Sequence, residues 1–304
     1  MDRTEQIQIK HSKQPPLLKV ENFSLSFRFY RQGIQESTLH VMRNMDLTID
    51  EGEIVAVVGA SGSGKSILAN AILGLLPEHV ILNGTLRYKG KAITRQEQEK
   101  LRGKEIMLIP QSTSSLDPLM KVGKQVRAII KKPNKKTIQQ EIFQRLDLPM
   151  DVGNRYPFEL SGGMMRRVLI AIALASNAKL IIADEPTPGL DNQVLQDSVM
   201  AIKQLASDGK GVLFITHDIS TALQIADKVA VMNAGKLVEM AEVESFTGKG
   251  ENLQHSYTKA LWNALPENEF ILEVMKQSVN EQSNDESEEG NMTDARSKQN
   301  QLSL

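Results

Sequence analysis

The sequence predicts an α/β fold, in which a phosphate-loop core on a mostly parallel sheet carries an N-terminal antiparallel β region and an inserted helical subdomain. Three apolar runs, residues 54–58, 180–183 and 211–216, have the length and composition of buried strands. Segments of helical character separate them, and this alternation is typical of a parallel sheet flanked by helices. A glycine-rich loop follows the first run directly, where a strand would lead into a helix.

The composition is that of a globular protein and narrows the possible functions. The chain has 304 residues, 40% hydrophobic and 24% charged, which suits one large α/β unit with appendages or two modest domains. A net charge of −1 offers no basic surface, so nucleic acid is not an expected partner. The absence of cysteine excludes disulfides, thiol catalysis and thiolate-bound metals. The longest apolar run, Val168–Ala175, is far shorter than the roughly 18 residues of a membrane span, so any membrane role must come through a partner.

The N-terminal part of the chain predicts a polar leader followed by a strand. Residues 1–16 are polar and lack the apolar centre of a signal peptide. From Leu17 to Leu25, apolar and polar residues alternate as in a half-buried strand. Aromatic residues gather here in a chain that has few of them: Phe23, Phe27, Phe29 and Tyr30. We expect residues 17–266 to form the main domain.

Two further segments differ in character from the core. Within residues 111–157, helical stretches between 128 and 148 are interrupted at 132–134 (Lys-Pro-Asn), and we expect a helical subdomain there. Short strands on either side of residues 233–235 predict a hairpin. The C-terminal extension, residues 267–304, is predicted to be a largely disordered polar tail, because it holds too little apolar surface to offset its ordering. A partner-binding tail is the alternative.

The glycine-rich loop is the strongest functional signal. It fits the pattern G-x-x-x-x-G-K-[ST] in full. Its residues are Gly59, Ala60, Ser61, Gly62, Ser63, Gly64, Lys65 and Ser66. Glycines let backbone N–H groups surround a phosphate, and the following helix directs its positive end at the same anion. We expect Lys65 to neutralise the β- and γ-phosphates of a nucleoside triphosphate and Ser66 to ligate Mg²⁺. A glycine-rich turn that binds nothing is the alternative.

A pair of carboxylates follows the second apolar run. Asp184 and Glu185 stand at the predicted carboxyl end of that strand, the edge at which ligands of such sheets bind. Asp184 is placed to hold Mg²⁺, and Glu185 to orient and deprotonate an attacking water. Two solvated acids at a strand end are the plainer interpretation.

Four further motifs resemble those of ATP-binding cassette (ABC) ATPases, in that family's order. Residues 160–164 (Leu-Ser-Gly-Gly-Met) resemble the signature motif, and Gln111 resembles the Q-loop glutamine. Residues 188–191 (Pro-Gly-Leu-Asp) resemble the D-loop, and residues 215–218 (Ile-Thr-His-Asp) resemble the switch-histidine segment. The resemblance spans most of residues 18–240.

This resemblance implies a phosphate-loop ATPase core in which two cassettes sandwich two ATP molecules. Gln111 would contact Mg²⁺ and the helical subdomain, His217 would sense the γ-phosphate, and Glu185 would polarise water. Phe27 would stack on adenine, with Phe29 or Tyr30 as alternatives, although any of these rings could simply be core. The residues expected to contact the nucleotide of the opposing subunit are Ser161, Gly162, Gly163 and Asp191.

A narrower resemblance points to one branch of the family. Residues 112–120, Met164 and residues 255–266 resemble dipeptide, oligopeptide and nickel importers. The branch implies an ATP-hydrolysing subunit at the cytoplasmic face of the membrane, serving peptide, nickel or metal-chelate uptake. It also implies two permeases, a second ATPase subunit and, indirectly, a substrate-binding protein. A soluble ABC ATPase acting on ribosomes or DNA and a regulatory, non-hydrolysing cassette are the alternatives. The apolar positions Tyr257, Leu261 and Leu265 also suit a terminal helix packed on a core.

The sequence departs from the branch at three places. Residues 164–167 (Met-Met-Arg-Arg) replace the usual methionine–arginine–glutamine–arginine, and residues 188–189 (Pro-Gly) stand where threonine–alanine is common. Ala60 replaces a common glutamate. Since the first two departures lie where the opposing subunit would dock, we expect a heterodimer with a second cassette.

Overall fold

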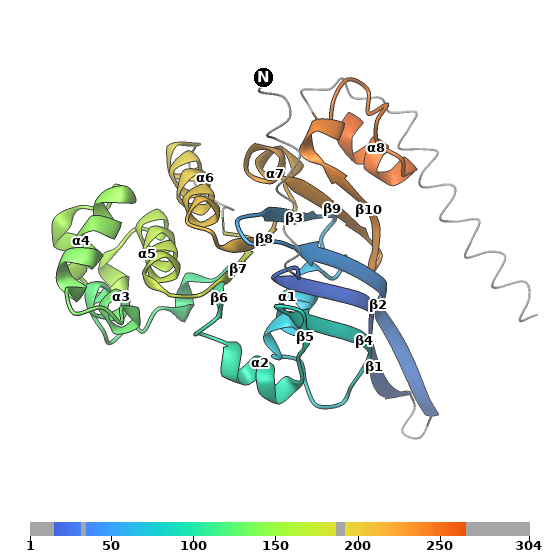
Figure 1. Cartoon of the computed structure of the whole chain (residues 1–304), viewed down its shortest axis with the longest axis horizontal. Coiled ribbons are helices and arrows are strands. Elements are labelled where there is room, and N and C mark those ends of the chain that lie inside the picture. Colours follow the sequence, from blue (N-terminus) through green and yellow to red (C-terminus); the bar gives the residue numbers. More distant parts are fainter. Residues whose placement is uncertain (1–14, 32–34, 187–191, 266–304) are drawn as a thin grey trace, which may run out of the picture. The chain divides into compact units, whose positions relative to one another are not determined.

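The computed structural model describes residues 15–31, 35–186 and 192–265 (Figure 1). Described residues up to Met240 belong to one compact unit, and those from Ala241 belong to a second. Most of the predicted leader and tail, and all of the D-loop at 188–191, lie outside the described residues. Within the described ranges, no helix combines the length and apolarity that a membrane crossing needs.

The first unit contains a four-stranded sheet of order β2-β1-β4-β5 (Figure 1). Its strands are β1 (Leu18–Arg31), β2 (Gln35–Ile49), β4 (Val80–Tyr88) and β5 (Lys91–Ala92). β1 pairs antiparallel with both β2 and β4, as predicted for this region. It continues past the expected limit at Leu25, because the aromatic residues there favour extended backbone and keep pairing with β2.

The second sheet has six strands in the order β10-β9-β3-β8-β7-β6. They are β3 (Ile54–Val58), β6 (Ile106–Ile109), β7 (Leu180–Asp184), β8 (Gly211–Ile215), β9 (Lys228–Asn233) and β10 (Lys236–Glu242). Strands β3, β6, β7, β8 and β9 pair in parallel. All residues of β3 and β8 are buried, as expected of central strands in a parallel sheet covered on both faces.

Eight helices occur in the described residues: α1 (Lys65–Leu73), α2 (Arg95–Leu101), α3 (Val122–Ile129), α4 (Lys135–Arg145), α5 (Gly162–Ala175), α6 (Asn192–Ser207), α7 (Ile219–Ile225) and α8 (Ser256–Asn263). Short 3₁₀ turns are η1 (Thr113–Ser115), η2 (Met150–Asn154), η3 (Pro157–Glu159) and η4 (Val243–Ser245). The predicted break at 132–134 is confirmed. α5 packs against α3 and α4 at one end of the unit (Figure 1). The group of helices therefore includes α5 and extends past residue 157, the expected end of the helical subdomain.

The hydrophobic core of the first unit joins both sheets to α1. It includes Leu18, Leu25 and Met42 of the antiparallel sheet, Val57 and Ile182 of the parallel sheet, and Leu68 and Ile72 of α1. Burial of each such side chain contributes roughly 1.5–3 kcal/mol relative to exposure. The helix that follows the phosphate loop is therefore fixed to the sheet by its own apolar face.

The second unit is ordered around α8. His255 Nδ1 accepts a hydrogen bond from the Tyr257 N–H at 3.1 Å and so caps the helix. The Trp262 ring packs edge-on against Phe246, and its Nε1 donates to Gly248 O at 3.1 Å. Tyr257, Leu261 and Leu265, the predicted apolar positions, are half-buried. The buried side chains of α8 are Thr258, Ala260 and Asn263. Asn263 Nδ2 donates to Lys249 O at 3.3 Å.

Candidate functional site

The phosphate loop runs from the end of β3 to the start of α1, as predicted. Gly59 approaches the backbone of β9 so closely that a Cβ there would lie 2.2 Å from Met232 O. No larger residue fits at that position without moving the loop. Gly64, in the left-handed region at φ 101°, precedes the first residue of α1. The loop thus presents the N-terminus of a helix whose axis is set by the core.

Lys65 lies folded over this loop. Its Nζ donates to Gly59 O at 2.9 Å and to Ala60 O at 3.0 Å. Burial lowers the pKa of Lys65, while the carboxylates of Glu185 and Asp184 oppose that shift. A phosphate in the loop would therefore give this buried ammonium an anionic partner in place of neutral carbonyls.

Two predicted metal ligands meet although they are far apart in the sequence. Ser66 Oγ donates to Asp184 Oδ1 at 3.1 Å. Burial raises the pKa of Asp184, and Glu185 adds to the shift, whereas Ser66 and Lys65 oppose it. The described residues hold no cluster of three or more histidine or carboxylate side chains that could bind a metal by themselves. This donor set fits Mg²⁺, which binds proteins through one or two side chains and completes its shell with waters and substrate phosphates.

Glu185 lies between two other predicted site residues. Gln111 Nε2 donates to Glu185 Oε2 at 2.8 Å, and His217 Nδ1 lies 3.4 Å from Glu185 Oε1. The three residues follow β6, β7 and β8, which are adjacent parallel strands, so their carboxyl ends meet at one edge. The Glu185 side chain is 18% exposed and that of His217 56% exposed. A water reaching Glu185 can thus also contact the imidazole.

The backbone of Glu185 is held from both sides. Its φ of 44° lies in the left-handed region, which residues with a Cβ seldom adopt. Its N–H donates to Ile215 O at 2.9 Å, and its C=O accepts from Arg166 Nη1 at 3.2 Å. Sequence reasoning missed Arg166. The one available signal was that this residue stands in the unusual Met-Met-Arg-Arg segment.

The turn between β9 and β10 supports the phosphate loop, and this contact was also missed. Ala234 and Gly235 both have positive φ, 44° and 75°, as in the tight turn of a two-residue hairpin. Gly235 N–H donates to Ser63 O at 3.2 Å, and Gly235 O accepts from Arg43 N–H at 2.9 Å. The turn of the predicted hairpin is therefore hydrogen-bonded to both the phosphate loop and β2. The sequence revealed the hairpin but not its contact with the loop.

The signature residues form a separate surface. Ser161 caps α5, with its Oγ accepting from the Met164 N–H at 3.2 Å. Ser161 and Gly162 are exposed, and a Cβ on Gly162 would meet no described atom within 4 Å. No hydrogen bond within the described ranges joins Ser161 to the phosphate loop. Gly163 lies beside them in the first turn of α5.

The predicted adenine-stacking residue has contacts of its own. Phe27 is half-buried against the core, and its ring centroid lies 6.4 Å from that of His79 at a tilt of 56°. Phe29 is more exposed, and nothing is described of the Tyr30 side chain. The choice among these three rings stays a prediction. Asp191 lies outside the described residues.

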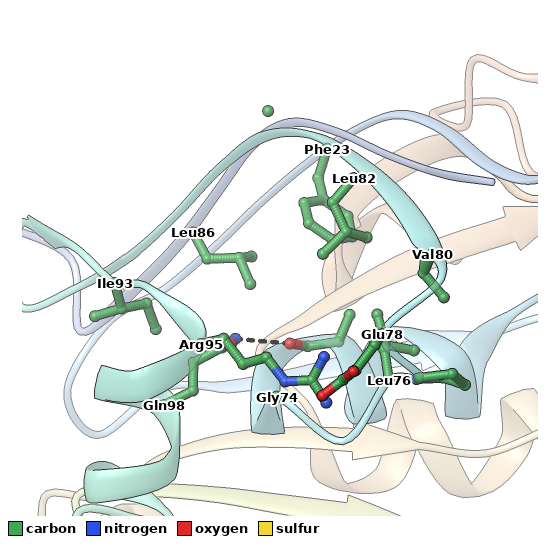
Figure 2. A pocket seen from close by; sticks show the side chains of 13 residues that line it. Phe23, Gly74, Leu76, Glu78, Val80, Leu82, Leu86, Ile93, Arg95 and Gln98 are labelled. Atoms are coloured by element: carbon green, nitrogen blue, oxygen red, sulfur yellow. Dashed lines mark hydrogen bonds between the residues drawn. The ribbon is translucent and has the colours of Figure 1, made fainter. Parts of the chain in front are cut away.

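An open cavity of about 180 Å³ lies elsewhere in this unit (Figure 2). Side chains of β4, the end of α1 and the start of α2 line it, and Arg95 and Glu78 extend toward one another at its rim (Figure 2). Gln98 Nε2 donates to Ala71 O at 2.7 Å, the dashed line in Figure 2, and so caps α1. None of the predicted site residues lines this cavity.

Comparisons with known proteins identify the family of this chain. A family model described as "ABC transporter" matches residues 42–188. The oligopeptide transport ATP-binding protein OppD of Bacillus subtilis (strain 168) is 37% identical over 265 residues, which cover 82% of this chain and 72% of OppD. The chain belongs to the ABC transporter ATPase family. The dipeptide transport ATP-binding protein DppD of Lactococcus lactis subsp. cremoris (strain MG1363) is 36% identical, over 82% of this ABC ATPase and 74% of DppD.

Solved structures agree with this assignment. A dimeric ATP-binding cassette in a post-hydrolysis state, bound to ADP and phosphate, has a TM-score of 0.63 and 27% identity to this ABC ATPase. The similarity covers 74% of this chain and 98% of that one. The predicted phosphate-loop ATPase fold is thereby confirmed, as is the prediction that the protein binds and hydrolyses ATP.

Proposed function

We propose that this ABC ATPase is the ATP-hydrolysing subunit of an importer for oligopeptides or dipeptides. The observation that carries the chemistry is the position of Glu185 between Gln111 and His217, next to the Ser66–Asp184 pair. The peptide cargo is supported by the names of the relatives, which are oligopeptide and dipeptide transport proteins. Nickel and metal-chelate cargo have no such support among them.

Each residue of the site has a distinct task. The backbone of residues 59–64 and the Lys65 ammonium bind the β- and γ-phosphates, and Ser66, Gln111 and Asp184 would hold Mg²⁺. Bound Mg²⁺ would neutralise charge on the phosphate oxygens. Glu185 accepts the proton of the attacking water, with its two carboxylate oxygens oriented by Gln111 and His217. His217 would also contact the γ-phosphate, because 56% of its side chain is exposed.

A second ATPase subunit completes the site. The start of α5 combines a serine, two glycines and a helix N-terminus, which together bind anions well. Because Ser161 and Gly162 are exposed and nothing described surrounds Gly162, the γ-phosphate held by a partner subunit can approach there. Asp191 would contribute from the same interface. The departures at 164–167 and 188–189 favour a heterodimer.

The helical subdomain offers a surface to the permeases. Leu119 is 87% exposed and Phe158 75% exposed, which is unusual for large apolar side chains. Their segments are joined, because Val122 N–H donates to Arg155 O at 3.0 Å and the Phe158 ring stacks on Tyr156. Two exposed apolar side chains on joined segments, one of them eight residues after Gln111, suit a cytoplasmic permease loop. The ATPase would then lie at the cytoplasmic face of the membrane.

The test replaces the proposed base without changing its shape. Glu185→Gln should abolish ATP turnover but preserve ATP affinity and ATP-dependent association with the partner cassette. Glu99→Gln makes the same charge change on the exposed face of α2 and should leave turnover unchanged. Steady-state phosphate release and equilibrium nucleotide binding measure the two effects. Retained turnover in Glu185→Gln would show that another group activates the water.

The assembly is tested by affinity purification of the full chain from detergent-solubilised native membranes. Recovery of two permeases and a second cassette is the expected result. Recovery of ribosomal or repair proteins without a permease would favour a soluble ABC ATPase instead. A partner complex that binds ATP but shows no turnover would favour a regulatory cassette.

A further inference from the structure

Arg166 is the one side chain that joins the signature helix to the backbone of Glu185 through a hydrogen bond described in the structure. Its Nη1 donates to Glu185 O at 3.2 Å. Arg166 lies one turn after Gly162 on α5, so the same helix carries the signature residues and this guanidinium. A movement at the start of the helix therefore reaches the carbonyl of Glu185 through a single side chain.

The carbonyl that Arg166 holds belongs to a strained residue. Glu185 has a φ of 44°, and a residue with a Cβ keeps a left-handed conformation only where its surroundings fix it. Ile215 O fixes the N–H side at 2.9 Å, and Arg166 fixes the C=O side. If the second contact is lost, the peptide plane can rotate. The carboxylate would then leave its position between Gln111 and His217.

The environment of Arg166 is consistent with this task. The residue is half-buried, and burial lowers the pKa of its guanidinium. No carboxylate among the described residues forms an ion pair with it. A charged donor that is withdrawn from water and meets a backbone carbonyl forms a stronger bond than a neutral donor would.

We propose that Arg166 is a positioning residue that holds the Glu185 backbone and links its conformation to the signature helix. The inference rests on the proposed function of Glu185 as the base. The signature residues and Glu185 of one chain would contact different ATP molecules. Arg166 therefore links the conformations of the two ATP sites of the dimer.

The experiment compares Arg166→Ala and Arg166→Lys in the full chain, in the assembly in which it hydrolyses ATP. Loss of a hydrogen bond to a charged donor should lower kcat about ten- to a hundredfold, with KM and ATP affinity changed less than about twofold. Arg166→Lys keeps a charged donor and should recover part of the lost kcat. Low millimolar guanidinium should likewise recover part of it in Arg166→Ala.

Arg167→Ala is the matched control, because Arg167 lies on the same helix and donates to Leu146 O and Asp147 O rather than to the site. It should lower thermal stability without a selective loss of kcat. Wild-type kcat in Arg166→Ala would overturn the proposal, as would a loss matched by Arg167→Ala and not recovered by Arg166→Lys. If Arg166→Ala does not fold, Arg166→Lys and Arg166→Gln test the proposal instead. A lowered kcat with little change in KM supports it, and a wild-type kcat in both overturns it.

Glu185→Gln, measured in parallel, distinguishes the positioning role of Arg166 from the assignment of Glu185 as the base. If Glu185→Gln is inactive while Arg166→Ala retains full kcat, the positioning role alone fails. If Glu185→Gln retains turnover, the assignment of the base fails, and the positioning role fails with it.

Discussion

Substituting Gly235 by alanine tests whether the β9–β10 turn supports the phosphate loop. Gly235 has a φ of 75°, and its N–H donates to Ser63 O at 3.2 Å. A Cβ at this position would lie 2.0 Å from Val41 O and 2.9 Å from the carbonyl carbon of Val41. Both are backbone atoms of a paired strand, so the clash is relieved only when the turn moves away from β2. That movement displaces the partner of Ser63.

The magnitude follows from two separable effects. A left-handed conformation costs an alanine about 1–2 kcal/mol relative to glycine. Overpacking adds about 1–3 kcal/mol when the neighbours must shift. Gly235→Ala should therefore lower the free energy of unfolding by about 2–5 kcal/mol. Gly209→Ala is the matched control, because its φ is 82° and a Cβ there would meet nothing within 4 Å. It should show only the first effect.

The assays are denaturant unfolding and equilibrium ATP binding on both variants. Gly235→Ala should lose more stability than Gly209→Ala and should also bind ATP more weakly, since the peptide of Ser63 is part of the phosphate cradle. Gly209→Ala should bind ATP as the wild type does. Equal losses of stability in the two variants, with unchanged ATP affinity in both, would refute the idea that the turn positions the loop.

Three further changes test the rest of the site. Lys65→Ala should weaken ATP binding about ten- to a hundredfold through loss of a charged donor; unchanged affinity in equilibrium binding would contradict the role of the loop. Asp184→Asn should flatten the acid part of the stability profile measured without nucleotide. Burial raises the pKa of Asp184 in the folded protein above its ordinary value of 3.8. Protonation of Asp184 therefore stabilises the folded state fully below pH 3.8, and this stabilisation is lost as the pH rises through the folded-state pKa. Identical slopes just above pH 3.8 in variant and wild type would contradict this. Leu119→Glu should abolish copurification with permeases while sparing ATP binding. Met200→Glu places the same charge at another exposed apolar side chain, on α6, and should not; equal loss in both would argue against a specific surface.

The side chains proposed to contact ligands are the part of the site that the sequence predicts. A phosphate loop, a carboxylate pair at a strand end and a histidine after a strand are tied to residue types, because their chemistry requires particular side chains. Their convergence also follows from the sequence, since β6, β7 and β8 are parallel and their carboxyl ends share an edge. The structure places Gln111 and Glu185 2.8 Å apart on this basis.

The supporting contacts were not predictable, because they involve backbone atoms that every residue has. Arg166 binds the carbonyl of Glu185, and Gly235 binds the carbonyl of Ser63. No sequence pattern records which carbonyl a donor will meet. The same holds for α8, where Trp262 and Asn263 donate to the carbonyls of Gly248 and Lys249.

The electrostatics of the site explain why it would bind both halves of its ligand together. Burial lowers the pKa of Lys65 and raises that of Asp184, because desolvation disfavours the charged form of each side chain. Each partly offsets the other, since Asp184 raises the pKa of Lys65 and Lys65 lowers that of Asp184. A phosphate alone would bind the Lys65 ammonium and leave Asp184 facing added negative charge. A divalent cation bound with the phosphate removes that repulsion, so the geometry favours the metal–nucleotide complex over either ion alone.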